Sequence, residues 1–73
     1  MKLDNKIEAY NYRVDVFFKN YITGGEKNYT VEFPEFWLAR KYIQALQDDK
    51  DIVNIYLLER ISDGSFDITR KFK

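Results

Sequence analysis

The clearest pattern of hydrophobic and polar positions in this chain has the period of an α-helix and covers residues 34–47. One side of this helix carries five hydrophobic residues, which are Phe36, Ala39, Tyr42, Ile43 and Leu46. Pro34 suits the first position of a helix, and the carboxylates of Asp48, Asp49 and Asp51 would oppose the helix dipole at its C-terminal end. The pattern therefore predicts one amphipathic helix that begins at Pro34 and ends near Gln47.

Four other segments have the period of two, or the enrichment in branched and aromatic residues, that is typical of β-strands. They are residues 10–19, 27–33, 52–61 and 65–72. The element order is then strand, strand, helix, strand, strand. This order predicts an α+β fold of ββαββ type, with a four-stranded, mainly antiparallel sheet and one helix packed on one face.

The turn between the first two strands contains Gly24 and Gly25, which can adopt the positive φ angles that a tight hairpin needs. If these two glycines form the loop, Phe18 pairs with Val31. In this pairing the hydrophobic residues of both strands lie on the same face of the sheet.

The last two strands are separated by Asp63 and Gly64, which are a strong signal for a two-residue hairpin loop. With this loop, Leu57 pairs with Arg70 and Glu59 pairs with Ile68. A longer loop would change that assignment.

Residues 1–9 are rich in charged and amide side chains and are predicted to form a flexible N-terminal tail, followed by a single domain over residues 10–73. Because one helix covers only one side of four strands, the opposite face of the sheet is expected to be open. Its predicted aromatic and aliphatic residues alternate with cations, and they are Phe17, Tyr21, Tyr56, Leu58, Arg13, Lys19, Arg60 and Lys71.

Three interpretations of this predicted face remain open. Aromatic rings between cations are typical of surfaces that stack single-stranded nucleic-acid bases. Four neighbouring hydrophobic side chains are also typical of a surface that another protein, or a second copy of the chain, covers. In the third interpretation the long Lys and Arg side chains lie over the rings and nothing binds.

Trp37 departs from the helical pattern, because its position on the helix falls among Arg40, Lys41 and Gln44 on the polar side. Two interpretations are open here as well. The chain before the helix folds over the indole and buries it, or the indole is exposed and contacts a partner, since Trp is strongly enriched in binding hot spots.

The composition narrows the possible functions. The 73 residues include no cysteine and no histidine, so thiolate ligands, imidazole ligands and the usual general base are missing, and we expect no catalytic residues, no metal site, no cofactor and no enzymatic activity. Twelve basic and twelve acidic residues give zero net charge, which disfavours nucleic acid as the partner. No apolar stretch has the length of a signal peptide or a membrane span, so we expect a cytoplasmic protein with no membrane partner.

The layout of YRVDVFFK, a glycine turn, NYTVEF, ARKYIQALQDD and IVNIYLLER is similar to that of small, uncharacterised phage and prophage proteins of low-GC Gram-positive bacteria. The resemblance covers residues 10–60 and implies an accessory protein that binds a host or phage protein. Together with the composition, it leads us to expect a non-enzymatic interaction module that uses Trp37 and the predicted open face, either with a protein partner or as a homodimer. Single-stranded nucleic-acid binding through the same face is the alternative.

Overall fold

The structure is a computed structural model that describes residues 10–73, so the predicted tail at residues 1–9 lies outside the described residues. The described chain forms five elements in the predicted order. They are β1 (Tyr12–Asn20), β2 (Gly25–Phe33), α1 (Phe36–Leu46), β3 (Ile52–Arg60) and β4 (Phe66–Lys71).

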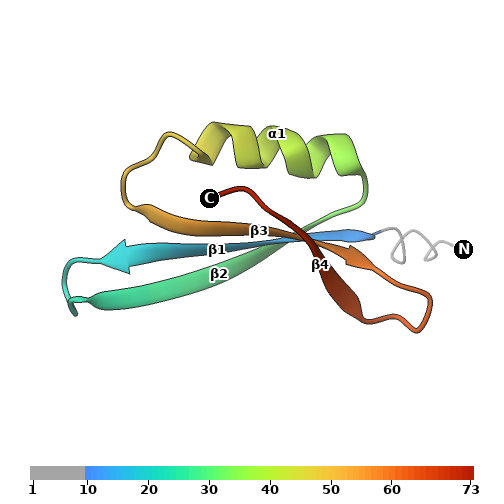
Figure 1. The fold of residues 1–73 in the computed structure, drawn as a ribbon, viewed down its shortest axis with the longest axis horizontal. Coiled ribbons are helices and arrows are strands. Elements are labelled where there is room, and N and C mark those ends of the chain that lie inside the picture. The colour runs from blue at the N-terminus through green and yellow to red at the C-terminus, as the bar shows by residue number, and fades with distance from the viewer. Residues whose placement is uncertain (1–9) are drawn as a thin grey trace, which may run out of the picture.

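The four strands form one sheet in the order β2-β1-β3-β4, and each neighbouring pair is antiparallel. Helix α1 lies along one side of this sheet, and no other element of residues 10–73 lies on the opposite side (Figure 1). The α+β prediction of a ββαββ chain with one helix on a four-stranded sheet is therefore confirmed. The inner strands, β1 and β3, are the two with buried residues, because hydrogen-bonded neighbours and the helix cover them.

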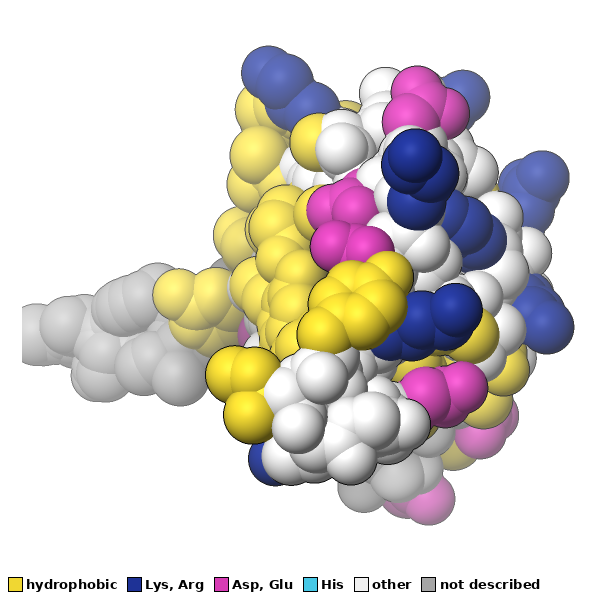
Figure 2. All heavy atoms as spheres, turned by 90° about the vertical axis from the view of Figure 1, so that its left-hand side faces the viewer, with side chains coloured by type: hydrophobic (Ala, Val, Ile, Leu, Met, Phe, Trp, Pro, Cys, Tyr) yellow, Lys and Arg dark blue, Asp and Glu magenta, His cyan; other side chains and the backbone are white. Residues whose placement is uncertain are grey.

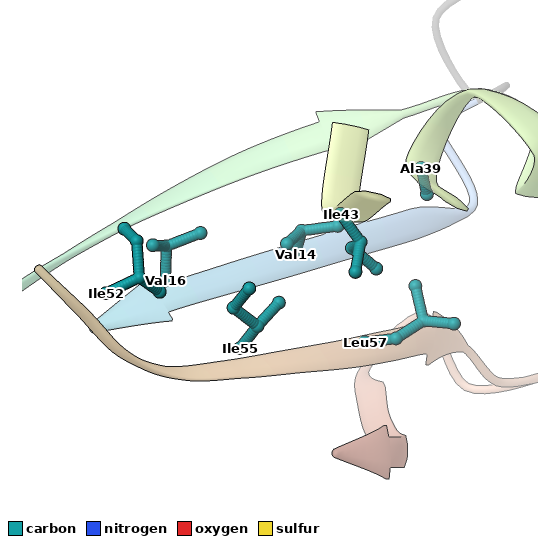
Figure 3. Close-up of a cluster of buried hydrophobic side chains, with 7 residues drawn as sticks. All are labelled: Val14, Val16, Ala39, Ile43, Ile52, Ile55 and Leu57. Carbon is teal, nitrogen blue, oxygen red and sulfur yellow. The ribbon is translucent and has the colours of Figure 1, made fainter. Parts of the chain in front are cut away.

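The core lies between α1 and the two inner strands. Ala39 and Ile43 from the helix are fully buried, as the helical period predicts. They meet residues of β1 and β3 in a cluster that Figure 3 shows in close-up, formed by Val14, Val16, Ala39, Ile43, Ile52, Ile55 and Leu57. Burial of each of the larger side chains contributes about 1.5–3 kcal/mol.

Helix α1 begins at Phe36, two residues later than predicted, because Glu35 has the extended backbone of an N-cap residue (φ −131°, ψ 148°). The carbonyl of Glu35 accepts the N–H groups of Leu38 and Ala39, so Pro34 precedes the helix instead of opening it. At the other end the last helical residue is Leu46, close to the predicted end, and the acidic segment that follows forms a turn.

The loop between β1 and β2 has four residues instead of the predicted two. The side-chain oxygen of Asn20 accepts the N–H groups of Ile22 and Thr23, and its carbonyl accepts that of Gly24 at 2.8 Å. Val31 consequently pairs with Val14, and the predicted pairing with Phe18 is wrong by four residues. Because this shift is even, each side chain still lies on the predicted face.

Residues 61–65 connect β3 to β4. The N–H of Ile61 bonds to the carbonyl of Ser65, so the hairpin loop inside this pair has three residues, and Gly64 in it has a φ of 91°. This loop shifts the register by one residue, and Ile68 therefore pairs with Leu58 and not with Glu59 as predicted. A β-bulge after Leu57 then restores the predicted register, so that Leu57 pairs with Arg70. Between the loop and the bulge, β4 presents the face opposite to the predicted one.

Candidate functional site

The candidate site is the face of the sheet that points away from α1, which we call the open face. Strand alternation and the observed registers assign its side chains. Six of its members come from the predicted set, and they are Arg13, Phe17, Tyr56, Leu58, Arg60 and Lys71. Sequence reasoning missed Phe66 and Ile68, because the one-residue shift in the β3–β4 loop brings them to this face.

Leu58 is buried under the other side chains of the open face. It is 8% exposed and does not belong to the cluster beneath the helix, although it was predicted to be an exposed contact residue. Its strand neighbours are Arg13 on β1 and Ile68 on β4. The open face therefore has a small packed layer of its own. Leu58 is buried in this layer and is not available for contact with a partner.

Two guanidinium groups cover the ring of Phe66. The Cζ atoms of Arg13 and Arg60 lie 4.1 Å and 4.7 Å from its centroid, within the range of cation–π attraction. Arg13 also forms an ion pair with Glu32 at 2.7 Å. Arg60 donates hydrogen bonds to the carbonyls of Tyr10 and Gly64. Both cations are thus held in fixed positions over the face. Because these side chains are already ordered, they lose less conformational entropy when a partner binds.

Side chains of the same chain also pack against the other aromatic rings of the open face, which are Phe17 and Tyr56. Phe17 and Tyr56 meet edge to face, with centroids 5.8 Å apart, and both are half-buried. The ammonium group of Lys71 lies 5.9 Å from the centroid of Tyr56. The ring faces on which nucleic-acid bases would stack are therefore partly covered by groups of the same chain.

Ile68 is the side chain of the open face that stands out into solvent, with 63% of its surface exposed. It lies on the edge strand β4, next to the ordered layer formed by Leu58, Phe66 and the guanidinium groups. A three-residue loop at Ser62–Gly64, in place of the two-residue loop predicted from Asp63 and Gly64, would have placed Ile68 on this face, because a longer loop changes the register.

Two predicted residues lie away from the rest of the face. Tyr21 belongs to the β1–β2 loop, where its hydroxyl donates a hydrogen bond to Asp51 at 2.8 Å. This bond and the negative charge of Asp51 raise the pKa of Tyr21. Lys19 lies at the loop end of β1, opposite Glu26. The structure therefore does not bring these two residues together with the aromatic and cationic cluster.

Trp37 is exposed, with 59% of its surface accessible, so the chain before the helix does not bury the indole, and its contact with a partner stays a prediction. Its indole N–H donates a hydrogen bond to the Glu35 carboxylate at 3.1 Å. The indole lines a shallow hollow on the outer side of α1 with Arg40, Lys41 and Gln44. Since α1 lies on the other side of the sheet, Trp37 and the open face are two separate surfaces.

No protein-family model, no curated protein and no solved structure matches this chain. Within residues 10–73, no three acidic side chains gather as they would around a metal ion. The helix found in the same residues is too short and too polar to cross a membrane.

Proposed function

We propose that this chain is a non-enzymatic protein-interaction module, which binds a partner protein through the open face of its sheet. The observation that carries the proposal is Ile68, a 63% exposed hydrophobic residue beside an ordered layer of aromatic and guanidinium groups. Solvent-exposed faces with this combination of an apolar contact and pre-ordered Arg and Tyr side chains have the composition of binding hot spots.

The charges of the open face indicate the chemistry of the partner surface. Arg13 is paired with Glu32, whereas Arg60 is bonded to carbonyl groups and carries no ionic partner among residues 10–73. Lys71 adds a further exposed cation, and the carboxylate of Asp15 on the same face accepts a hydrogen bond from Thr30. A partner that offers an apolar pocket for Ile68 with carboxylates at its rim complements these groups. In line with the resemblance to small phage and prophage proteins, the proposed partner is a cytoplasmic host or phage protein.

The test is affinity capture from a cell lysate with the wild-type chain and two variants. Ile68→Lys places a charge at the exposed position of the open face, and Trp37→Ala truncates an exposed residue on the other side of the molecule. Both positions are exposed, so circular dichroism is expected to show an unchanged fold. A protein that the wild type and Trp37→Ala capture but Ile68→Lys loses supports the proposal. Equal capture by all three chains, or no capture, speaks against it.

Binding of single-stranded nucleic acid through the same face is the second candidate, and the observation in its favour is that Arg13, Arg60 and Lys71 share a face with aromatic rings. The covered rings and the carboxylate of Glu32 weigh against it. Titration with labelled single strands at low salt decides between the two functions, because phosphate contacts are strongest there. Affinity that falls in Tyr56→Ala would favour nucleic acid, and absent affinity removes this candidate.

A further inference from the structure

The two edges of the sheet differ in how well they are protected against pairing with another strand. Strand β4 has six residues, its pairing with β3 is interrupted by a bulge, and it ends in two cations. These are features by which proteins block an edge. Strand β2 has nine residues, contains no proline, and pairs with β1 without an irregularity. Edge β2 is therefore the longer and more regular of the two, and its charged residues are Glu26, Lys27 and Glu32.

The hydrogen bonds of β1 show which backbone groups of β2 point outward. The N–H of Lys19 bonds to Asp51, and the carbonyl of Asn11 accepts the N–H of Arg60, so odd-numbered residues of β1 direct their backbone groups toward β3. Even-numbered residues of β1 then face β2, where their partners are the odd-numbered residues. The β2 residues that direct an N–H and a carbonyl to the free edge are consequently Glu26, Asn28, Thr30 and Glu32.

We propose that β2 pairs antiparallel with β2 of a second copy of this chain, so that two sheets join into one sheet of eight strands with a twofold axis at Thr30. In this arrangement both α1 helices lie on one side of the joined sheet. Both open faces lie together on the other side. The inference goes beyond the proposed function, because it concerns assembly of the chain with itself at a different surface.

Charge and packing disfavour two neighbouring positions of the axis. An axis at Tyr29 would place Glu26 opposite Glu32 of the partner subunit, and like charges directly opposite are destabilising. An axis at Thr30 instead places Asn28 opposite Glu32 of the partner subunit, where the amide meets a carboxylate. An axis at Asn28 also avoids the repulsion, but it leaves Val31 opposite Gly25 of the partner subunit.

The axis at Thr30 also covers hydrophobic surface that α1 leaves free. The loop end of the β1–β2 hairpin extends past the helix, and hydrophobic side chains gather along one side of this end of the molecule (Figures 1 and 2). Tyr29, in the middle of β2, is 36% exposed on the helix side of the sheet and packs against Phe18 with ring centroids 5.9 Å apart, while its hydroxyl accepts a hydrogen bond from Tyr42 of α1. In the proposed pairing Tyr29 lies opposite Val31 of the partner subunit, so the two hydrophobic strips join across the axis.

Cross-linking of single-cysteine variants tests the pairing, because the chain has no cysteine of its own. At the twofold axis the two Cα atoms of residue 30 are about 5.5 Å apart, which is a distance that a disulfide spans. Thr30→Cys is therefore expected to form a covalent dimer on mild oxidation. Asn28→Cys, which lies on the same edge but about 14 Å from its own copy, is the matched control and is expected to remain uncross-linked.

Light scattering of the uncross-linked wild type is the second measurement, and we expect a mass of twice 8.8 kDa at high protein concentration. Asn28→Pro removes one outward N–H and no bond to β1, so we expect dimerisation at least tenfold weaker with an unchanged circular dichroism spectrum. A strict monomer overturns the inference, as do equal cross-linking at both positions and a dimer that Ile68→Lys abolishes. These readouts use only the purified chain, so they are independent of whether a partner binds the open face.

Discussion

Leu58 and Ile68 lie side by side on the open face, but the first is buried and the second is exposed to solvent. The Leu58 side chain is 8% exposed on a face that no described element covers, whereas its neighbour Ile68 is 63% exposed. We expect Leu58→Ala to lower the free energy of unfolding by about 2–3 kcal/mol. Ile68→Ala is expected to lower it by less than about 1 kcal/mol, because little buried surface is lost.

Urea denaturation of both variants measures these two changes. Similar losses of stability at the two positions would mean that the open face does not have a packed layer of its own.

The pKa of Tyr42 gives a second prediction for a single residue. Burial and the hydrogen bond that its hydroxyl donates to Tyr29 raise this pKa to about 12. The unfolded chain loses the same proton near pH 10. Stability that is present below pH 10 is therefore lost as the pH rises toward 12, because the unfolded state ionises first.

Tyr42→Phe cannot ionise and provides the comparison. Urea denaturation at pH 9 and pH 11 is expected to show a larger loss of unfolding free energy in the wild type than in Tyr42→Phe. Equal losses in the two proteins would show that Tyr42 does not keep its proton in the folded state.

At the scale of the elements, the conformation of the β1–β2 loop requires glycine at position 24 but not at position 25. Gly24 has a φ of 80°, and a Cβ at this position would meet no atom within 4 Å. Only the backbone conformation then opposes Gly24→Ala, which is expected to cost about 1–2 kcal/mol. Gly25→Ala is the control, since Gly25 is outside the left-handed region and also has free space.

Thermal unfolding of the two alanine variants measures the difference. We expect Gly24→Ala to melt at a lower temperature than the wild type and Gly25→Ala to melt at the same or a higher one. A lower melting temperature for Gly25→Ala alone would contradict the four-residue loop.

Hydrophobic period and residue type were sufficient to predict the elements, because Ala39 and Ile43 recur at helical spacing, Val14 and Val16 of β1 lie two residues apart, and β3 is rich in branched residues. They were not sufficient to predict loop lengths. In the first hairpin the side chain of Asn20 binds loop N–H groups, and this contact is not visible in a pattern of hydrophobic positions.

In the second hairpin the loop and the bulge each add one residue, and their effects on the register cancel beyond Leu57. The sequence therefore predicts the far end of the hairpin correctly and the near end wrongly. Phe66 and Ile68 belong to that near end, which is why the most exposed hydrophobic residue of the candidate site was missed.

At the scale of the whole molecule, the residue composition of each strand explains its place in the sheet. Strands β1 and β3 hold the buried residues of the sheet, whereas β2 and β4 have mainly exposed side chains. Mostly polar strands are stable at an edge, where one side meets water. Residues 10–73 consequently form an elongated body of 46 × 22 × 21 Å, with one helix on one side of the sheet and the open face on the other.

The affinity of a captured partner protein for matched variants tests the role of the open face most directly. Ile68→Lys changes an exposed residue of this face, and Ile22→Lys makes the same change at a 94% exposed position in the β1–β2 loop. We predict that Ile68→Lys raises the Kd at least tenfold, or about 1.4 kcal/mol, and that Ile22→Lys leaves it within about twofold. Equal Kd values for the wild type and Ile68→Lys would contradict binding through the open face.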